Sequence, residues 1–547
     1  MKTATNPRRE GLRPLYRRLG GSVAILYLSG CGYTGFASLN DSNEQANDDS
    51  ENPSLSSDAR YVAFQSFADN LVPNSSSTTQ HVYTRDISTE TTAIASVSSG
   101  QIKGNGNSYF PTISRSGRYV AFESVASNLV SNDTNGERDI FLHDTTTGNT
   151  QRLNQFGFLP VVQANGFSGN VDIACTAGCR AVFESDATNL VSNDFNGLRD
   201  VFTWVAGGIE RVSVDKDGND ADGGSRSPAA ALGGIIAYQS IATNLLDFGT
   251  DNNGFNDIYV RNTALDQNSR VSVNWLGGDA NGNSTNPDID ASGQYVVFQS
   301  EASDLVFGDT NNFNSIYLRD RFNFFTEKIS VSTAGVSGNL ESSDPQISDD
   351  GRYVAFRSFA NNLVPNDTNG EADIFVRDRW KDTTTRVSVD TFGVEANDDS
   401  RHPTLSGNGR YAAFSSSARN LVPNDTNDIL FGGLLWINGD DIVVRFIPEV
   451  TVTAIVPNSL PAGETTSVTV TGSNFLAGSV GDISGSDETI SNLVIVDENT
   501  LTMDITLFAS AALGARNVSV LLPGNTAGLE KGGLGTCTGC ATVVAGP

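Results

Sequence analysis

The fold is decided by residues Pro345–Ser400, which read PQISDDGRYVAFRSFANNLVPNDTNGEADIFVRDRWKDTTTRVSVDTFGVEANDDS. Versions of this stretch recur from about residue 50 to about residue 447. One aromatic residue marks each copy, at Phe64, Phe122, Phe183, Tyr238, Phe298, Phe356 and Phe414. Successive markers are roughly 60 residues apart, and a near-constant period of this length indicates one supersecondary unit repeated along the chain.

Each copy contains four strand signals separated by turn residues. In the quoted copy they are Pro345–Ser348, Arg352–Ser358, Asp373–Asp378 and Thr385–Asp390. The run Tyr353–Phe356 is apolar on both faces, as expected of a strand that is covered on both sides. Four short strands per unit, with each sheet packed between two neighbours, describe a β-propeller blade. The seven copies therefore predict an all-β protein with a seven-bladed β-propeller over residues 51–447.

The turn between the first two strands carries a family resemblance. Residues Pro345–Phe356 read PQISDDGRYVAF, which resembles the TolB-type, WD-like propeller repeat with its P-x-x-S-x-D-G-x-x-x-A-F pattern. Good matches occur at Pro111–Phe122, Pro287–Phe298 and Pro403–Phe414. Degraded copies occur at Asp172–Phe183 and Pro228–Tyr238. The resemblance implies the propeller fold but no particular activity, because such folds host unrelated functions.

Four antiparallel strands per blade give the disc two different faces. Tight turns such as Asp349–Gly351 share one face, which we call the tight-turn face. The longer segments, such as Asn362–Gly370 and Glu395–Ser400, share the opposite loop face, and binding is usually carried by exposed loops of this kind. Since Phe36–Leu39 aligns with a fourth strand, we expect the chain to enter the ring from the tight-turn face.

Ring closure has two solutions in the sequence. The strand expected at Phe36–Leu39 can complete the seventh blade, so that both chain ends clasp the ring. Alternatively, Leu434–Asn438 and Ile442–Phe446, joined by a turn at 439–441, can form a local hairpin that supplies its own fourth strand. The local hairpin is the slightly favoured prediction.

The loop between the second and third strands carries the pattern Asp-x-Asn-Gly-x-x-Asp. Oxygen ligands at alternate positions around a glycine turn are what a hard cation such as Ca²⁺ requires. The same residues also make good turns without any metal, so a plain turn is the alternative. The full copies are Asp133/Asn135/Asp139, Asp194/Asn196/Asp200, Asp251/Asn253/Asp257 and Asp367/Asn369/Asp373, and Asp309/Asn311 and Asp425/Asn427 are partial copies.

The N-terminus has the features of an export signal. Six basic residues precede the short apolar run Val23–Leu28, which is too short to span a bilayer and favours a signal peptide over residues 1–30. Residues Leu28–Cys31 resemble the lipobox of bacterial lipoproteins, which implies lipidation of Cys31 and a tether over residues 31–50. The alternative is an ordinary signal peptide with a chance cysteine. We expect an exported, cell-envelope protein, anchored at the outer membrane and otherwise free of the bilayer.

The remaining cysteines form two close pairs. Cys175 and Cys179 flank a strand–turn–strand corner, and Cys537 and Cys540 lie in a Gly-rich stretch near the C-terminus. In an exported protein, local disulfides are the default interpretation of such pairs. Zinc would need four ligands, and no histidine lies near either pair in the sequence. We predict one structural disulfide in each pair.

The charge of the chain excludes some functions. The formal net charge is −28, and a body this acidic repels nucleic acid and anionic lipid. The histidines are His81, His143 and His402, and we expect His143 to be an exposed strand residue. No serine elbow, histidine pair at metal spacing or phosphate loop occurs. An enzyme would need a carboxylate pair hidden among many acids, so an enzyme is the less favoured hypothesis.

The repeat stops near Glu449. Alternating strands from Val452 onward predict a small β-sandwich over residues 449–547. Its run P-x-x-x-x-A-G…V-x-V-x-G-x-N-F resembles the IPT/TIG immunoglobulin-like domain, which implies a spacer or interaction module.

The sequence as a whole therefore predicts a non-catalytic binding or scaffold protein. We expect its loop face to contact a protein or glycan of the cell envelope, with calcium as a stiffener of the loops. The alternative is a propeller hydrolase acting on glycans or peptides. A deep axial pocket with converging carboxylates would favour the hydrolase, and a flat acidic face would favour binding.

Overall fold

The computed structural model describes most of the chain from residue 34 to residue 545. The positions that it does not describe are 1–33, 74, 76–77, 158–161, 177, 206–207, 248–249, 312, 424, 426, 428, 432–434, 438, 448–450, 474–479, 485–486, 498–499, 522–533 and 546–547. The expected signal peptide, the lipobox and Cys31 therefore lie outside the described residues. Within the described part, no helix is long and apolar enough to cross a membrane.

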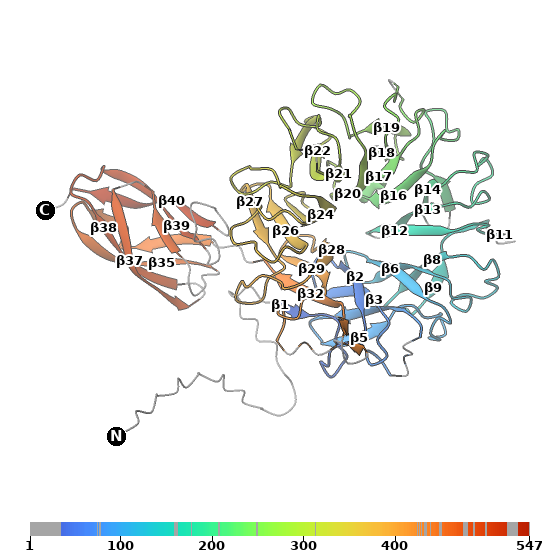
Figure 1. Ribbon diagram of the computed structural model, residues 1–547, viewed down its shortest axis with the longest axis horizontal. Coiled ribbons are helices and arrows are strands. Elements are labelled where there is room, and N and C mark those ends of the chain that lie inside the picture. Colours follow the sequence, from blue (N-terminus) through green and yellow to red (C-terminus); the bar gives the residue numbers. More distant parts are fainter. Residues whose placement is uncertain are drawn as a thin grey trace.

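Seven four-stranded antiparallel sheets in the described residues form a ring, which confirms the predicted seven-bladed propeller. Figure 1 shows the first strand of each blade nearest the centre. Blade one contains β2 (Ser50–Leu55), β3 (Tyr61–Ser66), β4 (His81–Asp86) and β5 (Thr91–Ile94). Blade two contains β6 (Ser108–Ile113), β7 (Tyr119–Ser124), β8 (Asp139–Asp144) and β9 (Thr150–Arg152). Blade three contains β12 (Ser168–Cys175), β13 (Cys179–Ser185), β14 (Asp200–Val205) and β15 (Gly208–Arg211).

The next three blades repeat this order. Blade four contains β16 (Ser225–Ala230), β17 (Ile235–Ser240), β18 (Asp257–Asn262) and β19 (Gln267–Arg270), with the 3₁₀ turn η1 (Leu232–Gly234) between its first two strands. Blade five contains β20 (Ser284–Ile289), β21 (Tyr295–Ser300), β22 (Ser315–Asp320) and β23 (Phe325–Lys328). Blade six contains β24 (Ser342–Ile347), β25 (Tyr353–Ser358), β26 (Asp373–Asp378) and β27 (Thr383–Arg386). A short hairpin of β10 (Gln155–Phe156) and β11 (Val162–Gln163) lies in the crossover between blades two and three.

The repeated aromatic markers form the packing core of the blades. Each lies on the second strand, and in the first six blades it stacks on an aromatic residue of the third strand, with ring centroids 5.8 to 6.3 Å apart. Phe64, Phe122 and Phe356 are fully buried. Burial of large aromatic side chains between neighbouring sheets is the main stabilising term that the repeat supplies.

The ring is closed by the N-terminal strand, so the favoured hairpin prediction is wrong. Blade seven contains β28 (Ser400–Leu405), β29 (Tyr411–Ser416), β32 (Asp441–Phe446) and, as its outer strand, β1 (Thr34–Phe36). The segment expected to begin the local hairpin contains β31 (Leu435–Ile437), which instead pairs with β30 (Ile429–Phe431) as a separate hairpin. Because β1 comes from the opposite chain end, closure covers the outer edge of β32 and makes blade seven four-stranded.

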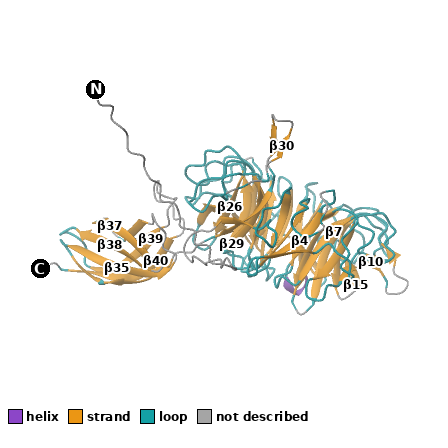
Figure 2. Ribbon diagram, turned by 90° about the horizontal axis from the view of Figure 1, so that it is seen from below, coloured by secondary structure: helices purple, strands orange, loops and turns teal. Residues whose placement is uncertain are grey.

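The two faces of the ring are arranged as predicted. Figure 2 shows β30 projecting from one face and the turn η1 on the other. The β30–β31 hairpin lies in a second-to-third connection and therefore marks the loop face, whereas η1 joins first and second strands and marks the tight-turn face. Thr34 pairs with Arg445 near the end of β32, which places the entry of the described chain at the tight-turn face.

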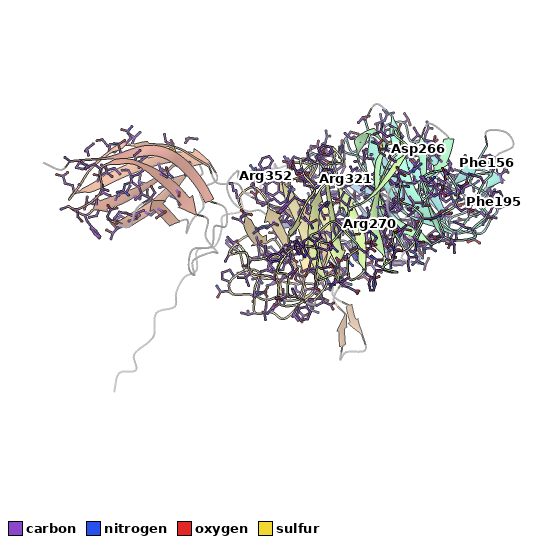
Figure 3. The ribbon with its side chains drawn as sticks, turned by 90° about the horizontal axis from the view of Figure 1, so that it is seen from above. Phe156, Phe195, Asp266, Arg270, Arg321 and Arg352 are labelled. Carbon is purple, nitrogen blue, oxygen red and sulfur yellow. A yellow bond between two sulfur atoms is a disulfide. The ribbon has the colours of Figure 1, made fainter. Side chains whose placement is uncertain are left out.

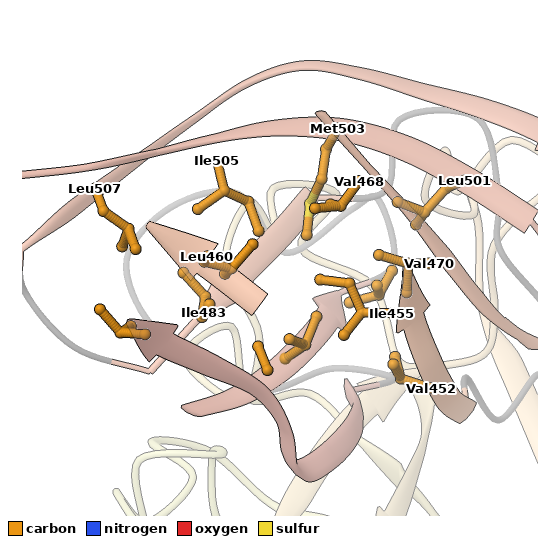
Figure 4. Packing of buried hydrophobic residues seen from close by; sticks show 14 of the residues in the cluster. Val452, Ile455, Leu460, Val468, Val470, Ile483, Leu501, Met503, Ile505 and Leu507 are labelled. Atoms are coloured by element: carbon orange, nitrogen blue, oxygen red, sulfur yellow. The ribbon is translucent and has the colours of Figure 1, made fainter. Parts of the chain in front are cut away.

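The C-terminal domain is a two-sheet sandwich, as predicted. One sheet has the order β33 (Thr451–Val456), β35 (Thr465–Ser473), β38 (Thr500–Leu507) and β37 (Glu488–Asp497). The other has the order β34 (Ser459–Pro461), β40 (Leu534–Val544), β39 (Gly514–Leu521) and β36 (Val480–Ile483). Figure 4 shows the core between them, which includes Val470, Leu501 and Ile505. Cys537 and Cys540 lie in β40 and not in an irregular tail.

Candidate functional site

The four full Asp-x-Asn-Gly-x-x-Asp loops fold alike, and the structure brings each set of three residues together. In blade six, Asn369 Nδ2 donates to Asp373 Oδ2 at 3.1 Å and to the carbonyl oxygen of Ala396 at 2.9 Å. The equivalent bonds are Asn135 to Asp139 at 3.0 Å, Asn196 to Asp200 at 3.2 Å and Asn253 to Asp257 at 2.8 Å. The asparagine thus links the loop, the start of the third strand and the crossover to the next blade.

The asparagines disagree with the calcium-ligand role that the sequence predicted for them. Each uses its side-chain oxygen, the atom that would bind the metal, to accept a backbone N–H two residues later. These bonds are Glu137 N to Asn135 Oδ1 at 3.3 Å, Leu198 N to Asn196 Oδ1 at 2.9 Å, Phe255 N to Asn253 Oδ1 at 2.8 Å and Glu371 N to Asn369 Oδ1 at 3.0 Å. The geometry is that of an Asx turn, which was the alternative to calcium.

An arginine from the fourth strand bridges the two aspartates of each set. In blade six, Arg386 Nη1 lies 3.3 Å from Asp367, 3.1 Å from Asp373 and 2.9 Å from Glu395. We call this arrangement the arginine-bridged pair, and Figure 3 labels one such residue, Arg270, within the body of the ring. The other three, with distances of 3.1 to 3.7 Å, are Arg152 with Asp133 and Asp139, Arg211 with Asp194 and Asp200, and Arg270 with Asp251 and Asp257.

These arginines supply a positive charge at the place where the sequence predicted calcium. Their side chains are less than 10% exposed, and both aspartates that each contacts are almost fully buried. A buried carboxylate needs a compensating partner, and a guanidinium provides it together with hydrogen bonds. A calcium ion in these loops would have to displace the arginine. In the described part of the chain, no group of three or more His, Cys, Asp or Glu side chains is arranged to hold a metal.

Calcium therefore stays an untested prediction for the four full copies of the motif, and in each copy a buried arginine already contacts the aspartates that would bind it. The sequence pattern showed the oxygen atoms but not the cation that already neutralises them. The residues concerned are Asp133, Asn135 and Asp139 in blade two, Asp194, Asn196 and Asp200 in blade three, Asp251, Asn253 and Asp257 in blade four, and Asp367, Asn369 and Asp373 in blade six.

Burial dominates the electrostatics of these pairs. It raises the pKa of Asp200, Asp257 and Asp367 to about 6, against the opposing effect of the neighbouring arginine. In blades three, four and six a serine hydroxyl donates to the third-strand aspartate, as from Ser388 Oγ to Asp373 Oδ1 at 2.5 Å, and in blade two Asn154 Nδ2 donates to Asp139 instead. Sequence reasoning missed the arginines. The available signal was a basic residue in the fourth strand, 13 positions after the third-strand aspartate in blades two, four and six.

A cavity of about 350 Å³, lined by both polar and apolar residues, lies on the axis of the ring, between the first strands of all seven blades. Each first strand enters it through a β-bulge, where the register of pairing shifts. The first bulge residue has a left-handed backbone in every blade, and these residues are Asn52, Phe110, Asn170, Ser227, Asn286, Asp344 and His402. The repeat therefore brings one such residue per blade to the lining of the cavity.

The backbone N–H groups of the bulges connect neighbouring blades. Phe110 N donates to Gln65 Oε1 at 2.8 Å, and Asn170 N donates to Glu123 Oε1 at 2.6 Å. The same contact with a Glu or Gln of the preceding blade is made by Ser227, Asn286 and Asp344. Blade six has Arg357 at this position, whose guanidinium cannot accept a hydrogen bond, so the series of equivalent bonds is interrupted before His402.

Besides Asp344, two further aspartates line the cavity, Asp172 and Asp288. Asp172 Oδ2 accepts from Ala230 N, and Asp288 Oδ2 accepts from Ile347 N, both at 2.8 Å and both across a blade boundary. Burial raises the pKa of both groups, to about 7 for Asp288, and the Asp172 carboxylate contributes to the shift of Asp288.

The tight-turn end of the axis is crossed by an ion pair. Arg115 of blade two and Asp349 of blade six are 2.8 Å apart, and Ser57 Oγ donates to Asp349 Oδ2 at 2.7 Å. Gly407 packs against these groups so closely that an added Cβ would lie 1.9 Å from Ser57 Oγ. These groups thus pack closely together across the axis at the tight-turn face.

The histidines differ from the expectation. His143 is buried and not exposed, because its Nδ1 is within 2.9 Å of Thr150 Oγ1 inside the blade. His81 is buried in the same way beside Ser96. His402 lines the axial cavity, and burial lowers its pKa. The prediction failed for His143 because a strand inside a blade is covered on both faces by neighbouring blades.

Both cysteine pairs are joined by disulfide bonds. Cys175 and Cys179 face one another across the β12–β13 corner with Cα atoms 4.1 Å apart, and Cys537 and Cys540 are bonded within β40. Neither bond lies at the axial cavity or at an arginine-bridged pair, so the first stabilises the β12–β13 corner and the second a short stretch of β40.

Comparison with known proteins concerns architecture. The family described as quinohemoprotein amine dehydrogenase, alpha subunit domain III, matches residues 449–524, in agreement with an immunoglobulin-like sandwich. No curated protein sequence matches the chain.

Among solved structures, a putative TolB of Agrobacterium tumefaciens is 13% identical, with 77% of this chain and 99% of that chain covered and a TM-score of 0.31. The WD40 repeats of RRP9 are 8% identical, with 76% and 99% covered and a TM-score of 0.35. Dipeptidyl peptidase 4 of Porphyromonas gingivalis is 15% identical with a TM-score of 0.36, and the alignment covers 68% of this chain but only 49% of that one. The likeness is one of fold and carries no activity.

Proposed function

We propose that this protein is a non-catalytic binding protein of the bacterial cell envelope that contacts a protein or glycan partner through the loop face of its propeller. The observation that carries the proposal is a pair of exposed aromatic side chains from neighbouring blades on that face. Trp275 and Phe307 are 53% and 77% exposed, and their rings meet edge to face with centroids 5.1 Å apart. Exposed aromatic residues are common energetic centres of protein interfaces, and their flat faces also suit sugar rings.

Further aromatic side chains lie on the loop face. Phe195 and Phe392 are 81% and 89% exposed in segments that connect strands on the same side of the ring. Figure 3 places Phe195 near the outer rim. Solvating four such side chains is unfavourable, and a partner that covers them gains the corresponding hydrophobic free energy.

The envelope location rests on the sequence. Lipidation at Cys31 would attach the chain shortly before β1, and β1 enters the ring at the tight-turn face. The loop face would then point away from the membrane. We assign the C-terminal sandwich to the IPT/TIG type as a spacer or second interaction module, supported by its alternating buried and half-buried residues in β38.

The test is comparative capture of partners from envelope extracts. The variant carrying Trp275→Ser and Phe307→Ser should lose a partner that the wild-type protein retains. The matched control carries Phe322→Ser and Phe324→Ser, which are similarly exposed at 63% and 77% but lie on the tight-turn face. Equal capture by all three proteins, or loss only in the control, would contradict the proposal.

A hydrolase is the second candidate, and the axial cavity is the observation that favours it. Asp172 and Asp288 both line it with raised pKa values, as a general acid requires. Against it, each carboxyl group already accepts two backbone N–H bonds, one of them across a blade boundary. Turnover of a glycan or peptide by the purified protein that is abolished by Asp288→Asn would establish the hydrolase instead.

A further inference from the structure

Blade seven departs from the arginine-bridged pair at its outer strand. Its strand pairing is equivalent to that of blade six, because Asp441 pairs with Ser416 as Asp373 pairs with Ser358. Ser38 Oγ donates to Asp441 Oδ1 at 2.8 Å, as Ser388 Oγ donates to Asp373. Phe36 pairs with Val443, two residues after Asp441, and Arg386 pairs with Phe375, two residues after Asp373. Phe36 therefore occupies the position in blade seven that Arg386 has in blade six.

The other blades show what accompanies a change of this arginine. In blade five a shorter cation, Lys328, contacts Asp309 at 3.0 Å, and the second aspartate is replaced by Ser315. In blade one Ile94 replaces the arginine, and both aspartates are replaced, by Ser75 and His81. Carboxylates and cation thus change together in these two blades.

Blade seven breaks this correlation. It keeps both carboxylates, as Asp425 and Asp441, although the apolar Phe36 stands at the arginine position. Gln45 takes the place that Glu395 has in blade six, and its Nε2 donates to Asp425 Oδ1 at 2.8 Å and to Asp441 Oδ2 at 2.6 Å. A neutral amide therefore stands between two carboxyl groups where blade six has a guanidinium.

The third motif residue, Asn427, provides an independent sign of a ligand. It is only 7% exposed, and neither its Nδ2 nor its Oδ1 makes a hydrogen bond of normal geometry. It lies close enough to Asp441 to favour the charged form of that carboxyl group. In the arginine-bridged pairs the equivalent asparagine bonds through both atoms, so a buried amide with neither atom satisfied is costly and indicates a missing ligand.

Electrostatics agree with that geometry. Burial raises the pKa of Asp441 to about 8, and the Asp425 carboxylate adds to this shift against hydrogen bonds from Ser38 and Gln45. Two facing carboxylates in a buried site repel one another unless a cation or a proton separates them. A hard divalent cation bound by carboxylate and amide oxygens would supply the positive charge that the guanidinium supplies in blade six and that the neutral Gln45 amide does not.

We propose that Asp425, Asn427 and Asp441 bind a calcium ion that locks the closure of the propeller ring, with Ser38 and Gln45 holding the carboxylates in place. Ser38 and Gln45 follow β1 at the N-terminal end of the ring, whereas the other three residues lie almost 400 positions later. An ion at this point ties the two ends together next to the three-residue strand β1. The site is independent of the loop-face aromatic residues and of the four arginine-bridged pairs.

The test uses the purified protein, calcium ions and the substitution Phe36→Arg, which restores the side chain of the other blades. Calcium added after EDTA treatment should release heat in calorimetry and raise the melting temperature of the wild-type protein, because a ligand that binds only the folded state stabilises it. Phe36→Arg should lose both responses and melt in EDTA at least as high as the wild type does with calcium.

Two further variants keep the result interpretable. Phe322→Arg adds the same charge at a 63% exposed position of blade five and should respond to calcium as the wild type does. Asp425→Asn should bind calcium at least tenfold more weakly, and it covers the case in which Phe36→Arg fails to fold. A wild-type protein without calcium heat and without a melting shift would overturn the proposal. A response retained in both Phe36→Arg and Asp425→Asn would also overturn it.

Discussion

Blade six and blade seven have the same strand order and pairing register, yet the two aspartates of the loop motif have different partners in them. In blade six, Arg386 contacts Asp367 and Asp373, so the charges are compensated within the chain. In blade seven, Phe36 stands at the arginine position, and the neutral amide of Gln45 bridges the two carboxyl groups. The repeated charges of blade six belong to the scaffold. The departure from the repeat in blade seven is the feature that indicates a ligand.

The largest expected effect comes from making blade six resemble blade seven. Arg386→Met removes the cation and leaves Asp367, Asp373 and Glu395 without it. Breaking a buried ion pair on one side costs about 3–5 kcal/mol, and we expect a loss of that size in the free energy of unfolding. Urea denaturation measures it. A loss below about 1 kcal/mol would show that the buried pair is not a stabilising element of the blade.

A second effect is a contribution to stability that is lost as the pH rises through the pKa of Asp441. That pKa is about 8 in the folded protein, so the folded state holds a proton that the unfolded chain releases at a much lower pH. The contribution is fully present below the ordinary carboxyl pKa and declines up to about pH 8, by at most ~1.4 kcal/mol per pH unit.

Thermal melting in EDTA between pH 7 and pH 9 checks this dependence. The buried histidines have lowered pKa values and act with the opposite sign, and their contribution fades as the pH rises above the ordinary histidine pKa of about 6.5. The melting temperature should fall from pH 7 to pH 8 and level off above, and Asp441→Asn should remove most of the fall, with Asp288, whose pKa is about 7, contributing the remainder. Calcium should flatten it in the wild type, because the ion takes the place of the proton. A melting temperature that rises over this range would contradict the assignment.

The smallest effect is expected at an exposed ion pair of the same repeat. Arg60 contacts Asp86 at 2.7 Å, but its side chain is 44% exposed. Solvent screens such a pair, so Arg60→Ala should leave the urea midpoint nearly unchanged, in contrast to Arg386→Met. A large loss would mean that the turn at Asp86, rather than burial of charge, carries the stability.

Features that depend on residues close together in the sequence could be predicted, whereas contacts between distant segments could not. The period and the strand pattern indicated the propeller, its two faces and the local cysteine pairs, because each depends on residues close in sequence. The motif also located the Asp-Asn-Asp sets correctly as clusters, but it assigned them to calcium. It did not reveal their arginines, although Arg386 follows Asp373 by only 13 positions, because pairing of the third and fourth strands decides that they meet.

The sequence by itself determined the seven-fold architecture, since a blade is built from local strand and turn preferences repeated along the chain. Only the tertiary structure decided how the ring closes. The outer edge of β32 could pair with a neighbouring segment or with β1, which is about 400 residues away, and no local sequence pattern distinguishes the two. The same choice brings Ser38 and Gln45 to Asp425 and Asp441. A site assembled by ring closure has no local sequence pattern, since its residues come from both ends of the ring.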